Sequence, residues 1–444
     1  ASGRVWASGR VRTSGRVRAP ARPRGRHAGA AAVCVLLAGA LSVLSAAPVE
    51  ARPLRPGETV LDRPRPETRA PGGRLGRIWI RPALTTALVF DDNVVANDAQ
   101  READLILRAV PSVSAEADWR GHRVAVSAKA ERGAYRTQSQ ENYLDWEAEA
   151  FGRLRLHRRL HASATARWQR GHVPRSSADD PADARVPTVY RGRSGEVVLK
   201  HAGAARAFTV RVSARSLDYD DVPARGGGTV NNDDRDRWIG EFEVAERWTL
   251  SPRLDGFGRS RANLRRYVRT FDDRGFARDS IGHATVAGVT WRPTGLTTVE
   301  GYGGVRQQVY ADPRFAPLLL PTAGIGVTGS PTQLTSAHLA LDQSVRETTE
   351  PAASGRLVTA LSARVDHELR RDLLLGLHAR YAVDDYRGIS RRDRHVGAGL
   401  DLTYLAGRHL HARLSVRHDR RDSSRPQVRT FRRNRIELGL EVRY

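Results

Sequence analysis

The segment Tyr143–Leu156 reads YLDWEAEAFGRLRL, and its even-numbered and odd-numbered positions differ in polarity. Leucine, tryptophan, alanine and glycine occupy the even positions, whereas Asp145, Glu147 and Glu149 lie at odd positions. Successive side chains of a β-strand point to opposite faces. The segment therefore predicts a strand with one apolar face and one charged face.

The same period-two alternation recurs from Arg77 to Tyr444, without a sustained apolar stripe of helical spacing. Clear examples are Arg123–Glu131, Phe208–Arg215, Arg237–Leu250, Leu410–Arg417 and Arg435–Tyr444. A soluble β-sandwich also alternates, but it has sheet edges that must be protected. Charge on one face of strand after strand matches a barrel with lipid outside and water inside. We predict an all-β fold, a transmembrane antiparallel up-and-down β-barrel of about eighteen strands, with sixteen as the alternative.

Breaks between these segments come in two lengths. Short breaks such as Arg370–Asp372 and Gly407 are typical of periplasmic turns, whereas Arg175–Val186 and Asp218–Arg237 are long and polar. Outer-membrane barrels place short turns in the periplasm and long loops outside the cell. We therefore expect the long segments to be extracellular.

The N-terminal region has the organisation of an export signal. Three arginines and His27 precede the uncharged apolar stretch Ala28–Ala47, and Val49-Glu50-Ala51 supplies small residues for cleavage. This order predicts a secretory signal peptide, with an N-terminal membrane anchor as the alternative. The predicted domains are a low-complexity leader plus signal (1–51), a disordered Pro/Arg-rich periplasmic segment (52–76) and an outer-membrane β-barrel (77–444).

Composition excludes several classes of protein. The single cysteine, Cys34, cannot build a disulfide framework, a cysteine zinc site or an iron–sulfur site. The 73 Lys+Arg and 49 Asp+Glu give a net charge of +24, and cleavage after residue 51 would leave +17. Nucleic-acid binders concentrate basic residues in a patch, but here arginines and acids interleave on the same strands. We therefore expect no nucleic-acid partner, and we expect loop arginines to meet lipopolysaccharide phosphates in the outer-membrane lipid.

Motif-like strings give no chemical site. Gly324–Gly329 matches G-x-G-x-x-G, but Pro321 precedes it, Ser330-Pro331 follows it, and no helical pattern is present. His367-Glu368 lacks the second histidine of a zinc helix. Two acidic clusters read better as solvated loop charges than as a cation site: Asp218, Asp220 and Asp221, and Asp233, Asp234 and Asp236. We predict no catalytic, cofactor-binding or metal-binding residues, no cofactor and no enzymatic activity.

The C-terminus, Arg435–Tyr444, reads RIELGLEVRY and alternates up to its last residue. A final strand that ends on an aromatic residue resembles the signal read by the barrel assembly machinery, although phenylalanine is commoner there than tyrosine. The last strand must also close the barrel against the first, near Ile78–Phe90.

Six short segments carry a family resemblance: Phe90–Val94, Ala103–Trp119, Leu217–Val222, Ser251-Pro252-Arg253, Phe271–Gly282 and Asp366–Leu369. Taken together they resemble an outer-membrane β-barrel porin family often found beside exopolysaccharide genes, and the resemblance covers most of Ile78–Tyr444. It implies location in the outer membrane of a Gram-negative bacterium. It further implies a porin-like channel for small solutes, or a link to surface polysaccharide export and its components. A non-conducting accessory barrel and an outer-membrane enzyme barrel remain the alternatives.

The alternation also predicts which charges face the lumen. The basic residues predicted to face the lumen are Arg123, Lys129, Arg153, Arg155, Arg211, Arg215, Arg413 and Arg417. The acidic residues predicted to face the lumen are Glu131, Asp145, Glu147, Glu149, Glu241 and Glu243. If the positive excess of the chain lies inside, the channel should prefer anions.

Overall fold

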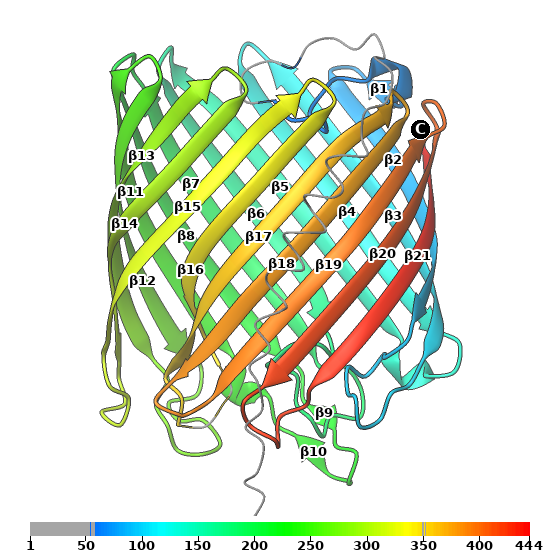
Figure 1. Cartoon of the computed structure of the whole chain (residues 1–444), viewed down its shortest axis with the longest axis vertical. Coiled ribbons are helices and arrows are strands. Elements are labelled where there is room, and N and C mark those ends of the chain that lie inside the picture. Colours follow the sequence, from blue (N-terminus) through cyan, green and yellow to red (C-terminus); the bar gives the residue numbers. More distant parts are fainter. Residues whose placement is uncertain (1–53, 55–57, 349, 351) are drawn as a thin grey trace, which may run out of the picture. The chain divides into compact units, whose positions relative to one another are not determined.

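The computed structural model describes residues 54, 58–348, 350 and 352–444. Most of these residues lie in one antiparallel sheet that closes on itself (Figure 1). The barrel strands are β2 (Ile78–Asp91), β3 (Asp104–Trp119), β4 (His122–Tyr135), β5 (Tyr143–His157), β6 (Leu160–His172), β7 (Val189–Ala202), β8 (Arg206–Tyr219), β11 (Arg237–Ser251), β12 (Leu254–Tyr267), β13 (Ser280–Thr294), β14 (Thr297–Tyr310), β15 (Leu318–Thr332), β16 (Thr335–Arg346), β17 (Gly355–Arg370), β18 (Leu373–Arg387), β19 (Arg392–Leu405), β20 (Leu410–Ser423) and β21 (Phe431–Arg443).

The closed sheet has 18 strands, which confirms the predicted all-β barrel and excludes the sixteen-strand alternative. Each strand pairs with its neighbours along the chain, and β2 and β21 close the barrel with a register from Ala83↔Arg443 to Asp91↔Arg435. The short strand β1 (Gly73–Leu75) pairs with Ile78–Ile80 of β2. Because β3 occupies the other edge of β2, β1 continues the edge on which β21 ends.

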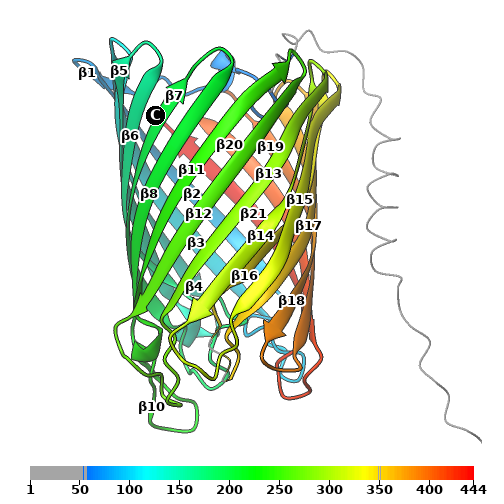
Figure 2. The same cartoon turned by 90° about the vertical axis from the view of Figure 1, so that its left-hand side faces the viewer.

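The two ends of the barrel differ in the length of their connections. Turns of two to four residues join the strands at one end, which also carries β1 and Tyr444, and loops of up to seventeen residues join them at the other. The tightest turns are two-residue hairpins, as at Arg120-Gly121, where both φ angles are positive (46° and 85°). The remaining short elements are η1 (Pro66–Thr68) at the short-turn end, and η2 (Ser139–Glu141), η3 (Asp233–Arg235) and the hairpin β9 (Val222–Pro223) and β10 (Thr229–Val230) at the loop end (Figure 2).

The outer face of the barrel carries an apolar band between two rings of aromatic side chains. At the loop end the exposed aromatics include Phe90, Trp146, Trp168 and Trp238, and at the short-turn end they include Trp119, Trp291, Tyr404 and Tyr444. On β11, Trp238 and Trp248 both face outward, and ten residues of a strand tilted by about 40° rise roughly 25 Å. This height matches the hydrocarbon region of a membrane-spanning barrel.

The predicted leader and signal, residues 1–51, lie outside the described residues. Within residues 54, 58–348, 350 and 352–444, no helix is long and apolar enough to cross a membrane. For 52–76 the sequence predicts disorder, but its described residues follow a defined path that includes η1 and β1. We call residues 58–71 the N-terminal strap.

Candidate functional site: the lumen and its loops

The loop between β6 and β7, residues 173–188, is the longest inward connection, and we call it the lumen loop. β17 lies across the barrel from β6 and β7 (Figure 1), yet its Arg356 donates a hydrogen bond to Asp179 of the lumen loop over 3.1 Å. The same guanidinium bonds Asp384 of β18 over 2.9 Å. From β20, Arg421 donates to the carbonyl of Ser177 over 3.2 Å. The lumen loop therefore spans the barrel and is held at the far wall.

A buried ion pair holds the base of the lumen loop. Arg175 binds Glu141 of η2 with two hydrogen bonds of 2.9 and 2.8 Å, and the side chains of Arg175 and Glu141 are 4% and 2% exposed. The guanidinium also donates to the carbonyls of Ala184 and Arg185, which lie on the returning half of the loop. The planar guanidinium of Arg175 thus donates hydrogen bonds to one carboxylate and two backbone carbonyls, and these bonds fix the conformation of the loop.

Asp180 provides the third attachment of the lumen loop. Its carboxylate accepts a 2.7 Å hydrogen bond from Arg429, in the loop between β20 and β21, and lies 3.6 Å from Arg175. Burial raises the pKa of Asp180 above its ordinary value, although both arginines favour the carboxylate. Lysine has no planar fork, so arginine suits these shared contacts.

The loop between β16 and β17 also turns inward and carries two acidic anchors. Glu347 contacts Arg265 and Tyr267 of β12. Glu350 contacts Arg391 and accepts a 2.9 Å hydrogen bond from Arg425. These contacts connect the loop to β12, to the loop between β18 and β19, and to the loop between β20 and β21.

The lumen loop borders three larger cavities and a small one of about 50 Å³. Its Asp179 borders one of about 870 Å³, Ser176–Ala178 line a second of about 610 Å³, and Pro174 and Arg175 line a third of about 300 Å³. In the largest cavity, Arg215, Arg237 and Arg346 form no ion pair with any described carboxylate. Six arginines and five carboxylates line this cavity, Glu241 among them, so its lining carries a small positive excess.

The structure brings most of the predicted lumen charges into mixed networks. Lys129 and Arg167 flank Glu147 at 3.7 and 3.9 Å, and Glu243 lies between Arg211 (3.4 Å) and Arg261 (2.5 Å). Arg413 bonds Asp401 over 2.8 Å. The alternation thus assigned these side chains to the inner face correctly, but it gave no indication that Arg237 and Arg346 would lie with Arg215 around one cavity.

The six carboxylates of the two acidic clusters lie in and beside the loop between β8 and β11. Asp220 binds Arg191 over 2.8 Å, Asp233 binds Arg269 over 2.9 Å, and Asp221 and Asp236 accept backbone hydrogen bonds. Burial raises the pKa of Asp236. Over the described part of the chain, no group of three or more His, Cys, Asp or Glu side chains is arranged to hold a metal ion. Gly324–Gly329 lies inside β15, so it is strand and not a nucleotide loop.

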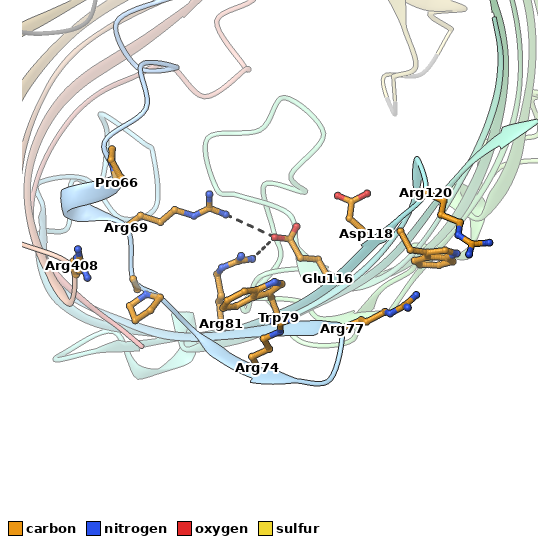
Figure 3. Close-up of a pocket in the computed structure, with 13 residues that line it drawn as sticks. Pro66, Arg69, Arg74, Arg77, Trp79, Arg81, Glu116, Asp118, Arg120 and Arg408 are labelled. Carbon is orange, nitrogen blue, oxygen red and sulfur yellow. Dashed lines mark hydrogen bonds and ion pairs between the residues drawn. The ribbon is translucent and has the colours of Figure 1, made fainter. Parts of the chain in front are cut away.

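At the opposite, short-turn mouth, the N-terminal strap lies against the inner rim. Arg63 and Arg65 bind the fully buried Glu368 of β17 at 3.0 and 2.6 Å, and His411 of β20 contacts the carbonyl of Thr68. Figure 3 shows Arg69 and Arg81 reaching Glu116 of β3, at 3.9 and 2.6 Å, beside a pocket of about 890 Å³. The proline-rich composition suggested disorder, but two arginines find a buried acceptor and order the segment.

Comparison with known proteins gives several structural similarities and one family match. The chain resembles, in structure, the siderophore receptor PirA from Pseudomonas aeruginosa (TM-score 0.43, 7% identity, 82% of this chain and 80% of that chain covered). It also resembles OccAB4 from Acinetobacter baumannii (0.44, 10%, 84% and 99%) and OccK2 from Pseudomonas aeruginosa in complex with glucuronate (0.45, 9%, 83% and 99%). No curated protein sequence matches the chain significantly. A family model matches residues 65–444, and the chain therefore belongs to the outer-membrane barrel family described as "Putative beta-barrel porin 2".

Proposed function

We propose that this porin-like barrel is a constricted diffusion channel that favours small anionic solutes. The observation that carries the proposal is the 870 Å³ cavity beside the lumen loop, where Arg215, Arg237 and Arg346 have no carboxylate partner in the described chain. Other lumen arginines, such as Arg211, Arg261 and Arg413, are paired with acids, and these three add unpaired positive charge beside the lumen loop. A solute that passes the lumen loop on this side meets them in a confined, polar space.

Planar-bilayer recordings test this proposal. Purified protein should conduct, and its reversal potential across a salt gradient should show a modest preference for anions that grows as salt falls, because physiological salt screens charges beyond about 8 Å. The triple variant Arg215→Gln, Arg237→Gln, Arg346→Gln should lose the preference. A matched control, Arg191→Gln, Arg266→Gln, Arg269→Gln, removes equal charge from exposed, paired arginines at the loop end and should keep it. Cation preference in the unaltered protein would refute the proposal.

One observation favours a second candidate, a non-conducting accessory barrel for surface polysaccharide export. The lumen loop crosses the barrel and is attached to β17, β20 and the loop after β20. A loop tied at several points can close the lumen to solutes. Absence of conductance in the wild type, together with conductance after deletion of residues 176–183, would support this second function.

A further inference from the structure

The short-turn end of the barrel carries exposed arginines that form no ion pair with another described residue. We call them the rim arginines: Arg77, Arg120, Arg158, Arg159, Arg253 and Arg408. Their side chains form no ion pair with a described carboxylate. In the pocket of Figure 3, no marked contact reaches Arg77, Arg120 or Arg408. They lie in turns distributed around the barrel, between β1 and β2, β3 and β4, β5 and β6, β11 and β12, and β19 and β20.

The acids at this end are mostly engaged with other arginines. Asp372 binds Arg370 over 2.8 Å, and Glu67 binds Arg371 over 2.7 Å. Glu116 binds Arg81, as described above. Asp118, which borders the pocket of Figure 3, forms no ion pair with a described arginine. The rim therefore presents a net positive surface to whatever lies beside it.

The height of the rim arginines relative to the lipid identifies that neighbour. Each turn follows an outward apolar side chain: Arg120 follows Trp119, Arg158 comes two residues after Leu156, and Arg253 three residues after Leu250. The outward aromatics of this end mark the boundary of the hydrocarbon region, so the next residues lie at the level of the lipid headgroups. Arginine matches phosphate with two parallel hydrogen bonds.

We propose that the rim arginines form a docking surface for the phosphate headgroups of anionic phospholipids in the leaflet at the short-turn end. A phospholipid seated there places its acyl chains on the apolar band and its phosphate among the turns. A guanidinium in this position also lacks the internal acids that compete for arginines at the loop end. The surface therefore prefers lipids with a net negative charge, such as phosphatidylglycerol, to the zwitterionic phosphatidylcholine.

Lipid retention tests the proposal. The folded protein is extracted in mild detergent from vesicles of equal parts phosphatidylglycerol and phosphatidylcholine, and the retained lipids are quantified by mass spectrometry. We expect phosphatidylglycerol to be enriched on the wild type. The variant Arg158→Gln, Arg159→Gln, Arg253→Gln should lower that enrichment about fivefold or more, since each basic residue at an anionic surface contributes substantially to lipid affinity. Lysines at the same three positions should preserve most of it.

The loop-end control Arg191→Gln, Arg266→Gln, Arg269→Gln removes the same charge from paired arginines and should change the enrichment by less than about twofold. Migration of the unheated protein as a compact barrel shows that each variant is folded. Equal retention of both lipids by the wild type, or unchanged enrichment in the glutamine variant, would overturn the proposal. Binding of polyglutamate without lipid preference would instead identify an acidic polymer as the partner.

Discussion

The loops at one end of the barrel and the turns at the other use arginine in different ways. At the loop end, Arg175, Arg356 and Arg429 are mostly buried and bind acids from other loops and strands. At the short-turn end, the rim arginines are exposed and have no acidic partner in the described chain. The same residue type therefore fixes the positions of loops where it is paired and buried, and stays available to ligands where it is unpaired and exposed.

The largest expected effect concerns assembly at the short-turn end. Tyr444 is 64% exposed on the lipid side, and its N–H donates to the carbonyl of Pro82 over 3.2 Å. Tyr444→Asp places a charge beside the closing strand pair and removes the terminal aromatic, so most of the folded barrel should be lost from the outer membrane. Heat-modifiable migration of membrane fractions measures this loss. Arg408→Gln, at the same end, should assemble normally. Normal assembly of both variants would show that Tyr444 is not needed for assembly of the barrel.

A second prediction concerns the band between the two ends. Ala128 faces lipid near the middle of β4, and Ser127 faces the lumen opposite Glu149. Ala128→Arg should cost about 2–4 kcal/mol of folding free energy, because a charge in the hydrocarbon region is poorly solvated. Ser127→Arg should cost less than about 1 kcal/mol, because water and Glu149 surround it. Urea unfolding in lipid vesicles compares the two, and equal costs would contradict the assigned faces.

A third prediction contrasts a paired and an unpaired arginine site. Glu141→Gln leaves the buried Arg175 with a neutral partner and should cost about 2 kcal/mol. It should also loosen the lumen loop, which limited proteolysis detects. Arg158→Gln, at the rim, should leave unfolding unchanged, because exposed unpaired charges contribute little to stability. A destabilising effect at the rim similar to that at Glu141 would remove the distinction between the two ends.

The smallest expected effect is a dependence on pH at the loop end. Burial raises the pKa of Asp180 in the attached lumen loop, so the attached state keeps its proton at a pH where a free loop has lost it. Acidification toward the ordinary value of 3.8 therefore favours the attached loop, and this contribution is lost as the pH rises through the raised pKa. Conductance should fall slightly on acidification. Asp180→Asn should not show this fall, and an increase in the wild type would contradict the sign.

The barrel was predictable from the sequence because each strand carries its own alternation. In β5, the alternation of Tyr143–Leu156 is enough to identify which of its side chains face lipid. The last strand likewise identifies the closing partner of Ile78–Phe90. The lumen loop was not predictable, because its position depends on pairs such as Arg356 and Asp179, which lie 177 residues apart. No local pattern encodes such a contact. The contact between Arg63 and Glu368 joins residues 305 positions apart. It could not be foreseen from the local composition of the strap, which therefore predicted disorder.

The path of the N-terminal strap has a consequence for how the barrel comes apart. The β2–β21 junction pairs Ala83–Asp91 with Arg435–Arg443 and joins the first and last barrel strands, so separation there opens the sheet without pulling apart a hairpin. The strap contacts Glu368 on one side of this junction and Glu116 on the other, and β1 extends the paired edge of β2. Because the strap contacts both sides of the junction, β2 and β21 can separate fully only after these strap contacts have broken. Such a contact slows unfolding, and the strap thereby lengthens the lifetime of the closed barrel.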